Sequence, residues 1–320
     1  MSVDGILLLD KPTGISSARA VAIVKRVLGG PNVSRKAAPK VGHLGTLDPF
    51  ASGLLPLCVG EGTKLAPYIA DADKSYSGVV RLGVCTDTLD GTGTVLTTTA
   101  APEPDTLDLD ALAAAFTGPQ AQVPPAFSAI KKQGVPMYKL AREGKAPELD
   151  ARDVIVHSMS LRAAADGRLE LEADCSKGTY VRALARDIGE RIGCGAILEE
   201  LVRTGFGRFR LDDAVALGEL EGRPELAAGA LIEPAKALAH LPAIAIDAQA
   251  ASSLRAGQQD VLAGLTDPAG STDDDVARLL DERGALVAVV KRRQKCWRLD
   301  RVFRAPEPCA PGTAMLQADG

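Results

Sequence analysis

The sequence predicts a mixed fold of strands and helices arranged in two domains. Its 320 residues exceed the roughly 100 to 200 that one domain usually holds. Hydrophobic residues make up 46% of the chain, which is ample for burial. Short patterns typical of strands alternate along the chain with patterns typical of helices, and neither type dominates. These observations favour a globular protein with a mixed architecture.

The N-terminal region predicts a strand followed by a helix. "GILLLDKP" at 5–12 is a short apolar run typical of a buried strand. "SSARAVAIVKRVLGG" at 16–30 has a serine cap, apolar residues at helical spacing and a Gly-Gly stop. Further on, Asp48 and Pro49 precede a long apolar run, and this order is typical of an N-cap and first turn of a helix. We therefore also expect a helix after Asp48.

The middle of the chain continues the alternation. Residues 77–96 predict two strands around an Asp-Gly turn at Asp90, and 107–118 predict a helix that Gly118 ends. In 168–193, apolar residues first alternate as in a half-buried strand. After a polar loop they recur at helical spacing. Strand ends and the loops that follow them are common places for site residues.

A change of composition separates the last quarter of the chain. The Ala/Pro-rich stretch 232–247 is typical of a hinge, so we expect one domain over 1–240 and a second over 241–320. The second contains a helix-like stretch at 247–259 and a strand-like stretch at 284–293. A small β-rich accessory domain is the expected form.

Several classes of protein and site find no support. No apolar run approaches the roughly 20 residues of a membrane span, and the N-terminus lacks the features of a secretory signal, so we expect a cytoplasmic protein without a membrane. Six cysteines without a CxxC pair and only three histidines predict neither a disulfide framework nor a metal site. "GEGTKL" at 60–65 lacks P-loop spacing, and the Asp90 turn lacks the acids of a calcium loop.

The distribution of charges is compatible with binding of a polyanion, although the net charge is −4. Residues 291–304 carry seven basic side chains against one acid, with Trp297 and Phe303 interleaved, and residues 131–145 carry five against one. These runs are candidate nucleic-acid surfaces. The alternative is solvated faces that acids such as those at 272–275 offset.

Four ordered blocks resemble one known family. They are "GHLGTLDPFASGLLPLCVGEGTK" at 42–64, "DKSYSGVVRLGVCTDTLDGTG" at 73–93, "PPAFSAIKKQGVPMYKLAREG" at 124–144 and "CSKGTYVRALARDIG" at 175–189. Together they resemble the TruB family of tRNA pseudouridine synthases, which isomerise uridine 55 in the TΨC arm of tRNA.

The resemblance implies a fold and a set of partners. The fold would be α+β, with a mixed, largely antiparallel sheet, flanking helices and a small C-terminal β-rich domain of PUA-like type. The substrate would be the TΨC stem-loop of tRNA, flipped at the target base. The resemblance further implies no cofactor, no metal and no obligatory protein partner, and we expect a monomer.

Three residues match the family's catalytic positions. Asp48 resembles the catalytic aspartate, which attacks the nucleoside at the base or at the ribose; Arg182 resembles the arginine that pairs with it. Tyr76 resembles the tyrosine that stacks on the target base. Each has an alternative from the residues alone: Asp48 as a helix cap, Arg182 as a surface arginine paired with Asp187 or Glu190, and Tyr76 as an ordinary strand tyrosine. The two roles of Asp48 are compatible, and we expect both.

Further positions match substrate-binding residues of the family: His43, Tyr180, Leu201, Lys11, Lys64 and Lys131. His43 resembles a histidine that fills space vacated by the flipped base, although a lone histidine after glycine is also a common surface residue. Leu201 fits a pocket position and a core position equally. Phosphate contact and packing at strand ends explain the lysines equally well.

Two other functions remain as alternatives. The chain resembles, more distantly, synthases that work inside a guide-RNA complex, but those usually carry Lys-rich tails and this sequence ends in "PGTAMLQADG". A non-catalytic tRNA-binding or folding chaperone is the second alternative, in which Asp48 only caps a helix.

Overall fold

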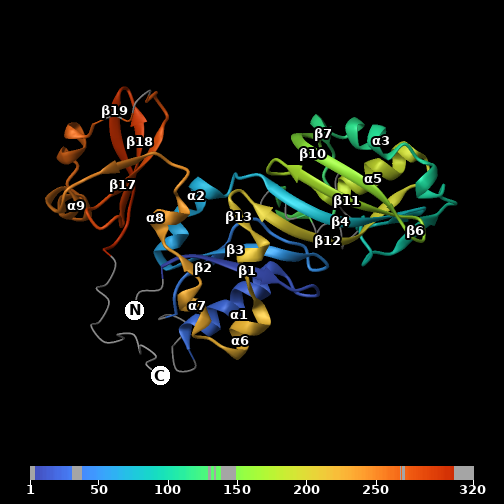
Figure 1. Cartoon of the computed structure of the whole chain (residues 1–320), viewed down its shortest axis with the longest axis horizontal. Helices are drawn as coiled ribbons and strands as arrows, with labels where there is room; N and C mark the ends of the chain where they lie inside the picture. Colours follow the sequence, from blue (N-terminus) through green and yellow to red (C-terminus); the bar gives the residue numbers. More distant parts are fainter. Residues whose placement is uncertain are drawn as a thin grey trace, which may run out of the picture.

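The computed structural model describes residues 4–30, 38–128, 131–132, 135–137, 149–266, 268 and 271–305. Two units make up the described chain: a long one built on a large sheet, and a smaller one built on a C-terminal sheet (Figure 1). None of the helices that the structure describes combines the length and the hydropathy of a membrane span.

The large sheet has eleven strands among the described residues and is mixed and largely antiparallel, as predicted. Eight strands form its main path, and only β1 with β14 and β3 with β12 pair in parallel within the sheet. Along the path the strands are β14 (Val215–Ala216), β1 (Gly5–Lys11), β3 (Ser52–Val59), β12 (Ala196–Phe206), β4 (Lys74–Leu82), β11 (Arg168–Cys175), β10 (Arg152–Ala164) and β7 (Gly118–Gln122). Three short strands pair alongside it: β2 (Val41–His43), β13 (Phe209–Arg210) and β15 (Leu231–Ile232).

The helix predicted after Asp48 is wrong, because the apolar run there is strand β3. The carbonyl of Asp48 accepts from the backbone N–H of Ala51 at 3.2 Å, which closes a turn with Pro49 at its second position. The strand that follows is buried on both faces, with Leu55 and Leu57 in one core cluster and Leu54 in another. A strand buried on both faces shows no alternation, so its sequence does not distinguish it from a buried helix.

The predicted N-terminal strand and helix are confirmed. Helix α1 (Ser17–Gly29) begins after Ser16, whose side chain accepts from the backbone N–H of Arg19 at 3.2 Å. Its buried residues Ala20, Ile23 and Val24 cover one face of the sheet. The other face, which includes Ile6 and Leu8 of β1, belongs to a second core cluster that extends to residues of the C-terminal sheet.

The predicted strand-loop-helix of 168–193 is also confirmed. Strand β11 alternates between buried and open positions, and helix α5 (Val181–Ile192) follows it. Gly193 ends the helix at φ 93°, a conformation that glycine adopts without strain.

Residues 77–96 contain more structure than the two strands expected. The chain leaves β4 at Gly83 and forms β5 (Val84–Thr86), which pairs with β6 (Val95–Thr98) across the loop that holds Asp90. Helix α3 (Leu109–Ala115) forms as predicted, with Asp108 accepting from the backbone N–H of Ala111. The remaining short elements of this unit are η1 (Gly60–Leu65), α2 (Ala66–Ile69), η2 (Pro104–Thr106), β8 (Lys131–Lys132), β9 (Val135–Pro136), η3 (Leu211–Asp213), α6 (Leu217–Gly222) and α7 (Leu226–Gly229).

The Ala/Pro-rich stretch is a packed connection rather than an open hinge. β15 pairs with β1, and helix α8 (Pro234–Ala237) follows it. The C-terminal sheet has the order β16 (Ala243–Ala245), β17 (Val276–Leu280), β18 (Leu286–Arg293) and β19 (Cys296–Val302), with α9 (Ala248–Arg255) and η4 (Asp260–Gly264) against it. Its own core cluster, and a second cluster to which β1 also contributes, make it a β-rich unit docked on the large-sheet unit.

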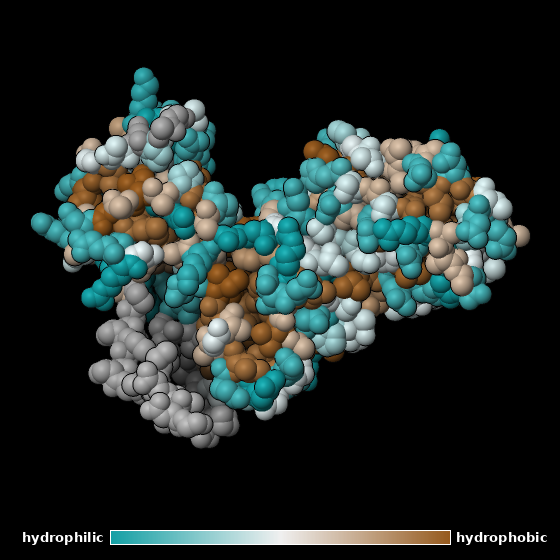
Figure 2. Space-filling view, viewed as in Figure 1, coloured by the Kyte–Doolittle hydropathy of each residue, from teal (hydrophilic) through white to brown (hydrophobic). Residues whose placement is uncertain are grey.

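The basic run at 291–304 differs from the expected aromatic surface. Trp297 is 5% exposed and Phe303 is 2% exposed, so both belong to cores. Lys291 and Arg292 lie 3.8 Å from Asp274 and Asp273, as the solvated-face alternative anticipates. On the visible face of the molecule, hydrophilic residues cover much of both units, and each unit also shows apolar areas among these residues (Figure 2).

Candidate active site

The loop that carries Asp48 is clamped by the N-terminal strand and helix. Ser17 is 2% exposed, and its hydroxyl donates to the carbonyl of Leu47 at 2.9 Å and accepts from the N–H of the same residue at 2.8 Å. The N–H of Gly14 donates to the carbonyl of Pro49 at 2.7 Å. The loop is therefore held on both sides of Asp48 by the segment "DKPTGISS".

Lys11 holds the end of the same loop from inside the protein. Its ammonium is fully buried and donates to the carbonyls of Ala51 at 2.6 Å, Pro12 at 2.8 Å and Ile15 at 3.0 Å. Burial lowers the pKa of Lys11 to about 8, with Asp48 opposing the shift. Because all three N–H donors point at carbonyls, contact with an RNA phosphate would require Lys11 to leave this position.

Arg182 pairs with Asp48. It is the second residue of α5 and only 4% exposed, and its Nη2 lies 2.8 Å from Oδ2 of Asp48. The guanidinium also donates to the carbonyls of Thr88 at 2.7 Å and Phe127 at 2.9 Å. The alternative pairing with Asp187 or Glu190 does not occur, since Arg186 pairs with both of those acids.

A second carboxylate faces the same guanidinium and was missed as a site residue. Oδ2 of Asp90 lies 3.5 Å from Nη1 of Arg182, and Asp90 is 4% exposed. Its Oδ1 accepts from the hydroxyls of Thr88 at 2.8 Å and Thr92 at 2.5 Å and from the N–H of Thr92 at 3.0 Å. The sequence showed a turn at Asp90, but only the fold brings that turn to α5.

The surroundings of Asp48 set its protonation. Burial raises the pKa of Asp48, and Arg182 opposes this by favouring the carboxylate. Asp90 adds to the rise, while Lys11 opposes it. With 37% of its side chain exposed, Asp48 is open to a ligand while Arg182 behind it is not. The pair therefore presents a partly open carboxylate against a buried, permanent cation.

Tyr76 lies on β4, directly opposite Arg203 of β12 and Ala173 of β11. Burial raises the pKa of its hydroxyl, and Arg203 opposes the shift through charge and a hydrogen bond. Tyr76 packs against the large core cluster that contains Leu201, which is 7% exposed. Leu201 is thus a core residue whatever else it does.

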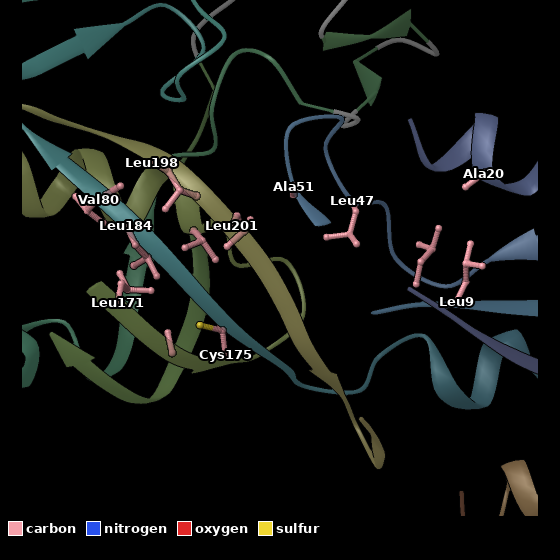
Figure 3. Packing of buried hydrophobic residues seen from close by; sticks show 14 of the residues in the cluster. Leu9, Ala20, Leu47, Ala51, Val80, Leu171, Cys175, Leu184, Leu198 and Leu201 are labelled. Atoms are coloured by element: carbon pink, nitrogen blue, oxygen red, sulfur yellow. The ribbon is translucent and has the colours of Figure 1, made fainter. Parts of the chain in front are cut away.

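The buried neighbours of Asp48 belong to the same core cluster as Leu201. Leu47 and Ala51 contribute from the loop and from the start of β3 (Figure 3). Tyr180 stands just before α5, where its backbone exchanges hydrogen bonds with the side-chain amide of Gln122. Burial raises the pKa of Tyr180, and Asp48 adds to the rise. Asp48, Tyr76 and the pair Tyr180 and Arg182 thus come from three separate segments to one region.

The other predicted substrate contacts are less tightly grouped. His43 ends β2, and burial together with Arg203 lowers its pKa, which favours the neutral imidazole. Lys64 pairs with Glu61 and donates to the carbonyl of Val302 at 2.8 Å, so it lies where η1 meets the C-terminal sheet. The side chain of Lys131 lies outside the described residues. Over the described chain no group of His, Cys, Asp and Glu side chains is arranged to hold a metal ion.

Family models match most of the large-sheet unit. The model of "TruB family pseudouridylate synthase (N terminal domain)" matches residues 33–181. The model of "tRNA pseudouridylate synthase B C-terminal domain" matches residues 182–236. The boundary between the two models falls at Arg182.

Curated proteins and solved structures agree with these matches. A protein of Chromohalobacter salexigens named tRNA pseudouridine synthase B is 45% identical over 278 residues, 87% of each chain. One of Aromatoleum aromaticum with the same name is 46% identical over 269 residues, 84% of each chain. A structure titled as an H/ACA RNP bound to a substrate RNA containing 2'-deoxyuridine matches with TM-score 0.70 and 23% identity, covering 96% of this chain and 87% of that one; it shows likeness of fold alone. The family models and the close relatives together show that the chain belongs to the TruB family of pseudouridylate synthases.

Proposed function

We propose that this protein isomerises uridine to pseudouridine in tRNA, at position 55 of the TΨC arm, as a stand-alone enzyme. Its relatives of 45% and 46% identity carry the name tRNA pseudouridine synthase B. The observation that carries the proposal is the pair of Asp48 and Arg182, in which a partly open carboxylate meets a buried guanidinium at 2.8 Å.

The reaction needs no group beyond the chain and its substrate. The bond between N1 of uracil and C1' of the ribose breaks, the detached base turns, and a bond forms between C5 and C1'. The proton on C5 leaves to solvent and N1 gains one, so the product is an isomer and no oxidant, reductant or energy source is consumed. Asp48 acts as the nucleophile that forms the covalent intermediate, at the base or at the ribose.

Arg182 keeps Asp48 ionised when a bound base excludes water from the site. Burial alone favours the neutral acid, and a neutral carboxyl is a poor nucleophile. The guanidinium stays charged at any working pH and is itself fixed by two backbone carbonyls and by Asp90. Asp90 is therefore assigned as the residue that positions Arg182.

The aromatic residues and Leu201 form the walls for the extruded base. Tyr76 provides a face on which the flipped uracil stacks, and Leu201 and Tyr180 line the same region. His43, neutral at working pH, stands at the mouth of the site. Apart from Asp48 and Arg182, these walls are largely uncharged, which suits a neutral base.

We assign tRNA contact in part to the C-terminal unit. In keeping with a division at 240 and 241, the C-terminal sheet has its own core cluster. Arg293, Lys295 and Arg298 are exposed along β18, β19 and the turn between them. Exposed cations of this kind bind phosphates with a strong dependence on salt.

The test is release of tritium from tRNA labelled at C5 of uridine, with the purified chain alone. Wild type should release one tritium per tRNA, and Asp48→Asn none, while both bind tRNA equally. Asp212→Asn, at an exposed position of η3, is the matched control and should behave as wild type. A transcript with cytidine at position 55 should release nothing above background.

Each alternative function gives a different result. Binding without release by wild type would replace the enzyme with a tRNA-binding or folding protein. Release only after a guide RNA or protein is added would replace the stand-alone enzyme with a guided one. Full activity of Asp48→Asn would exclude Asp48 as the nucleophile.

A further inference from the structure

Arg203 is a buried cation in the middle of the large sheet that the reaction outlined above does not use. It lies in β12, where its nearest partners across the sheet are Gly53 of β3 and Tyr76 of β4. It is only 1% exposed and is among the largest fully buried side chains among the described residues. A buried guanidinium is costly unless its donors are satisfied, so its contacts indicate what keeps it there.

Those contacts join the loop of Asp48 to the sheet. Nε donates to the carbonyl of Leu54 in β3 at 2.7 Å, and Nη2 donates to the carbonyl of Gly45 at 3.2 Å. Gly45 has φ 68°, and a Cβ added there would lie 3.4 Å from Nη1 of Arg203 and 3.1 Å from the ring of Phe206. Glycine at this position lets the loop lie directly on the guanidinium.

An aromatic ring packs against the guanidinium, and a second buried cation lies near the same ring. Its central carbon lies 5.4 Å from the centroid of the Phe206 ring, and Nζ of Lys74 lies 4.6 Å from the same centroid. Lys74 is itself tied to the carbonyls of Ala70 and Ala72. Arg203 and Lys74 therefore both lie within cation–π distance of the fully buried ring of Phe206.

The charge of Arg203 reaches two residues assigned to the site. Tyr76 pairs directly across the sheet with Arg203, whose charge favours the ionised form of the Tyr76 hydroxyl and disfavours the protonated form of His43. Leu54 and Gly45, whose carbonyls accept from Arg203, belong to β3 and the Asp48 loop, while Tyr76 belongs to β4. Arg203 thus joins the segment of the nucleophile to the strand of the aromatic wall.

We propose that Arg203 is a positioning residue of the reaction, which fixes the loop of Asp48 against β3 and orients the hydroxyl of Tyr76 without touching tRNA. The proposal rests on the proposed function, since it assigns Asp48 and Tyr76 their roles. A lysine is a poor substitute here because it has no planar fork with which to reach Gly45, Leu54 and Tyr76 together.

The test compares Arg203→Met and Arg203→Lys with wild type and with Arg210→Met, a control at an exposed position of the neighbouring strand β13. In single-turnover tritium release, Arg203→Met should be slower by about 100-fold, the scale expected for a misplacement of about 1 Å. Arg203→Lys should recover only part of the rate. Both variants should bind tRNA within about twofold of wild type, because the side chain is buried.

A second readout does not depend on activity. The pKa of His43, measured by NMR, should rise in Arg203→Met towards the ordinary value of about 6.5. Arg203 is the charged group that acts on His43 in the described structure, beside burial itself. Arg203→Lys keeps the charge and should leave the pKa of His43 close to that of wild type.

The outcomes separate the two proposals. Failure of wild type to release tritium would overturn the proposed function, while the titration of His43 would still test the contact of Arg203. Single-turnover rates within about threefold of wild type in both variants would overturn the positioning role. Weaker tRNA binding with an unchanged rate at saturating tRNA would also overturn it. If Arg203→Met does not fold, Arg203→Lys decides, and a rate equal to wild type refutes the need for the fork.

Discussion

Replacing Ser17 by alanine should damage both stability and activity, although Ser17 has no place in the chemistry. The hydroxyl of Ser17 satisfies both the N–H and the carbonyl of Leu47, the residue before Asp48. In Ser17→Ala both backbone groups lose their partner inside the protein. An unpaired buried polar group costs about 1 to 3 kcal/mol, and alanine returns at most about 0.5 kcal/mol through helix propensity. The expected loss in the free energy of unfolding is about 2 to 4 kcal/mol.

The expected kinetic effect follows from the same contact. Without Ser17 the loop around Asp48 loses its contact with α1 and keeps those with Gly14, Lys11, Arg203 and Arg182, so the carboxylate gains freedom to move relative to Arg182. A shift of about 1 Å reduces the rate of a positioned reaction by up to about 100-fold. The single-turnover rate should fall more than tRNA binding does.

The assay is urea unfolding followed by far-UV circular dichroism, together with single-turnover tritium release. Fluorescence is less suitable because Trp297 is the one tryptophan of the chain and lies in the C-terminal sheet. Ser252→Ala, at an exposed position of α9, is the control and should change stability by less than about 0.5 kcal/mol. A loss below about 0.5 kcal/mol for Ser17→Ala with an unchanged rate would refute the reasoning.

Two further predictions concern protonation. Burial and Asp90 raise the pKa of Asp48, and Arg182 lowers it. The pH below which the rate falls should therefore lie above about 4. This pH should be lower in Asp90→Asn and higher in Arg182→Met. Single-turnover rates from pH 4.5 to 8 measure this, and shifts in the same direction for both variants would contradict it. Burial lowers the pKa values of Lys11 and Lys74 to about 8, so each group makes the unfolded chain bind more protons between pH 8 and 10.5 and contributes stability that rises with pH there, by up to about 1.4 kcal/mol per pH unit. The buried thiols of Cys58 and Cys175, whose pKa values burial raises to about 12, oppose this rise above about pH 9. Urea unfolding at pH 7.5, 8.5 and 9.5 should therefore show a more positive dependence of stability on pH in wild type than in Lys74→Met; equal slopes would count against the buried charge.

Local sequence patterns predicted an element correctly where its own residues determine its type and its ends. The α1 helix follows from its serine cap, its apolar spacing and its glycine stop, and β11 with α5 follows from a change of period within 168–193. The motif blocks led to the family that the comparisons show. They also directed attention to Asp48, Tyr76 and Arg182, because functional groups of this kind recur at fixed positions within such blocks.

Sequence patterns gave the wrong structure where the packing of distant residues decides whether a segment is a strand or is buried. The apolar run after Asp48 was expected to form a helix and is the strand β3, because its two faces belong to two core clusters, one that includes α1 and one that extends to the C-terminal sheet. Trp297 and Phe303 were candidates for a basic nucleic-acid surface and are buried, because burial of a large aromatic ring is strongly favourable. Neither outcome is encoded within a few residues of the segment concerned.

The site shows the same division between what is local and what is distant. By itself the sequence determined the mixture of strands and helices and the boundaries of the best-defined helices, and its motif blocks indicated which short segments to propose for the chemistry. Only the tertiary structure decided that Ser17, Asp90 and Arg203 support Asp48, Arg182 and Tyr76, because each contact joins residues that are far apart along the chain. Hydrogen bonds and charge interactions depend on distance in space, and that distance is set when β3, β12 and β4 assemble into one sheet.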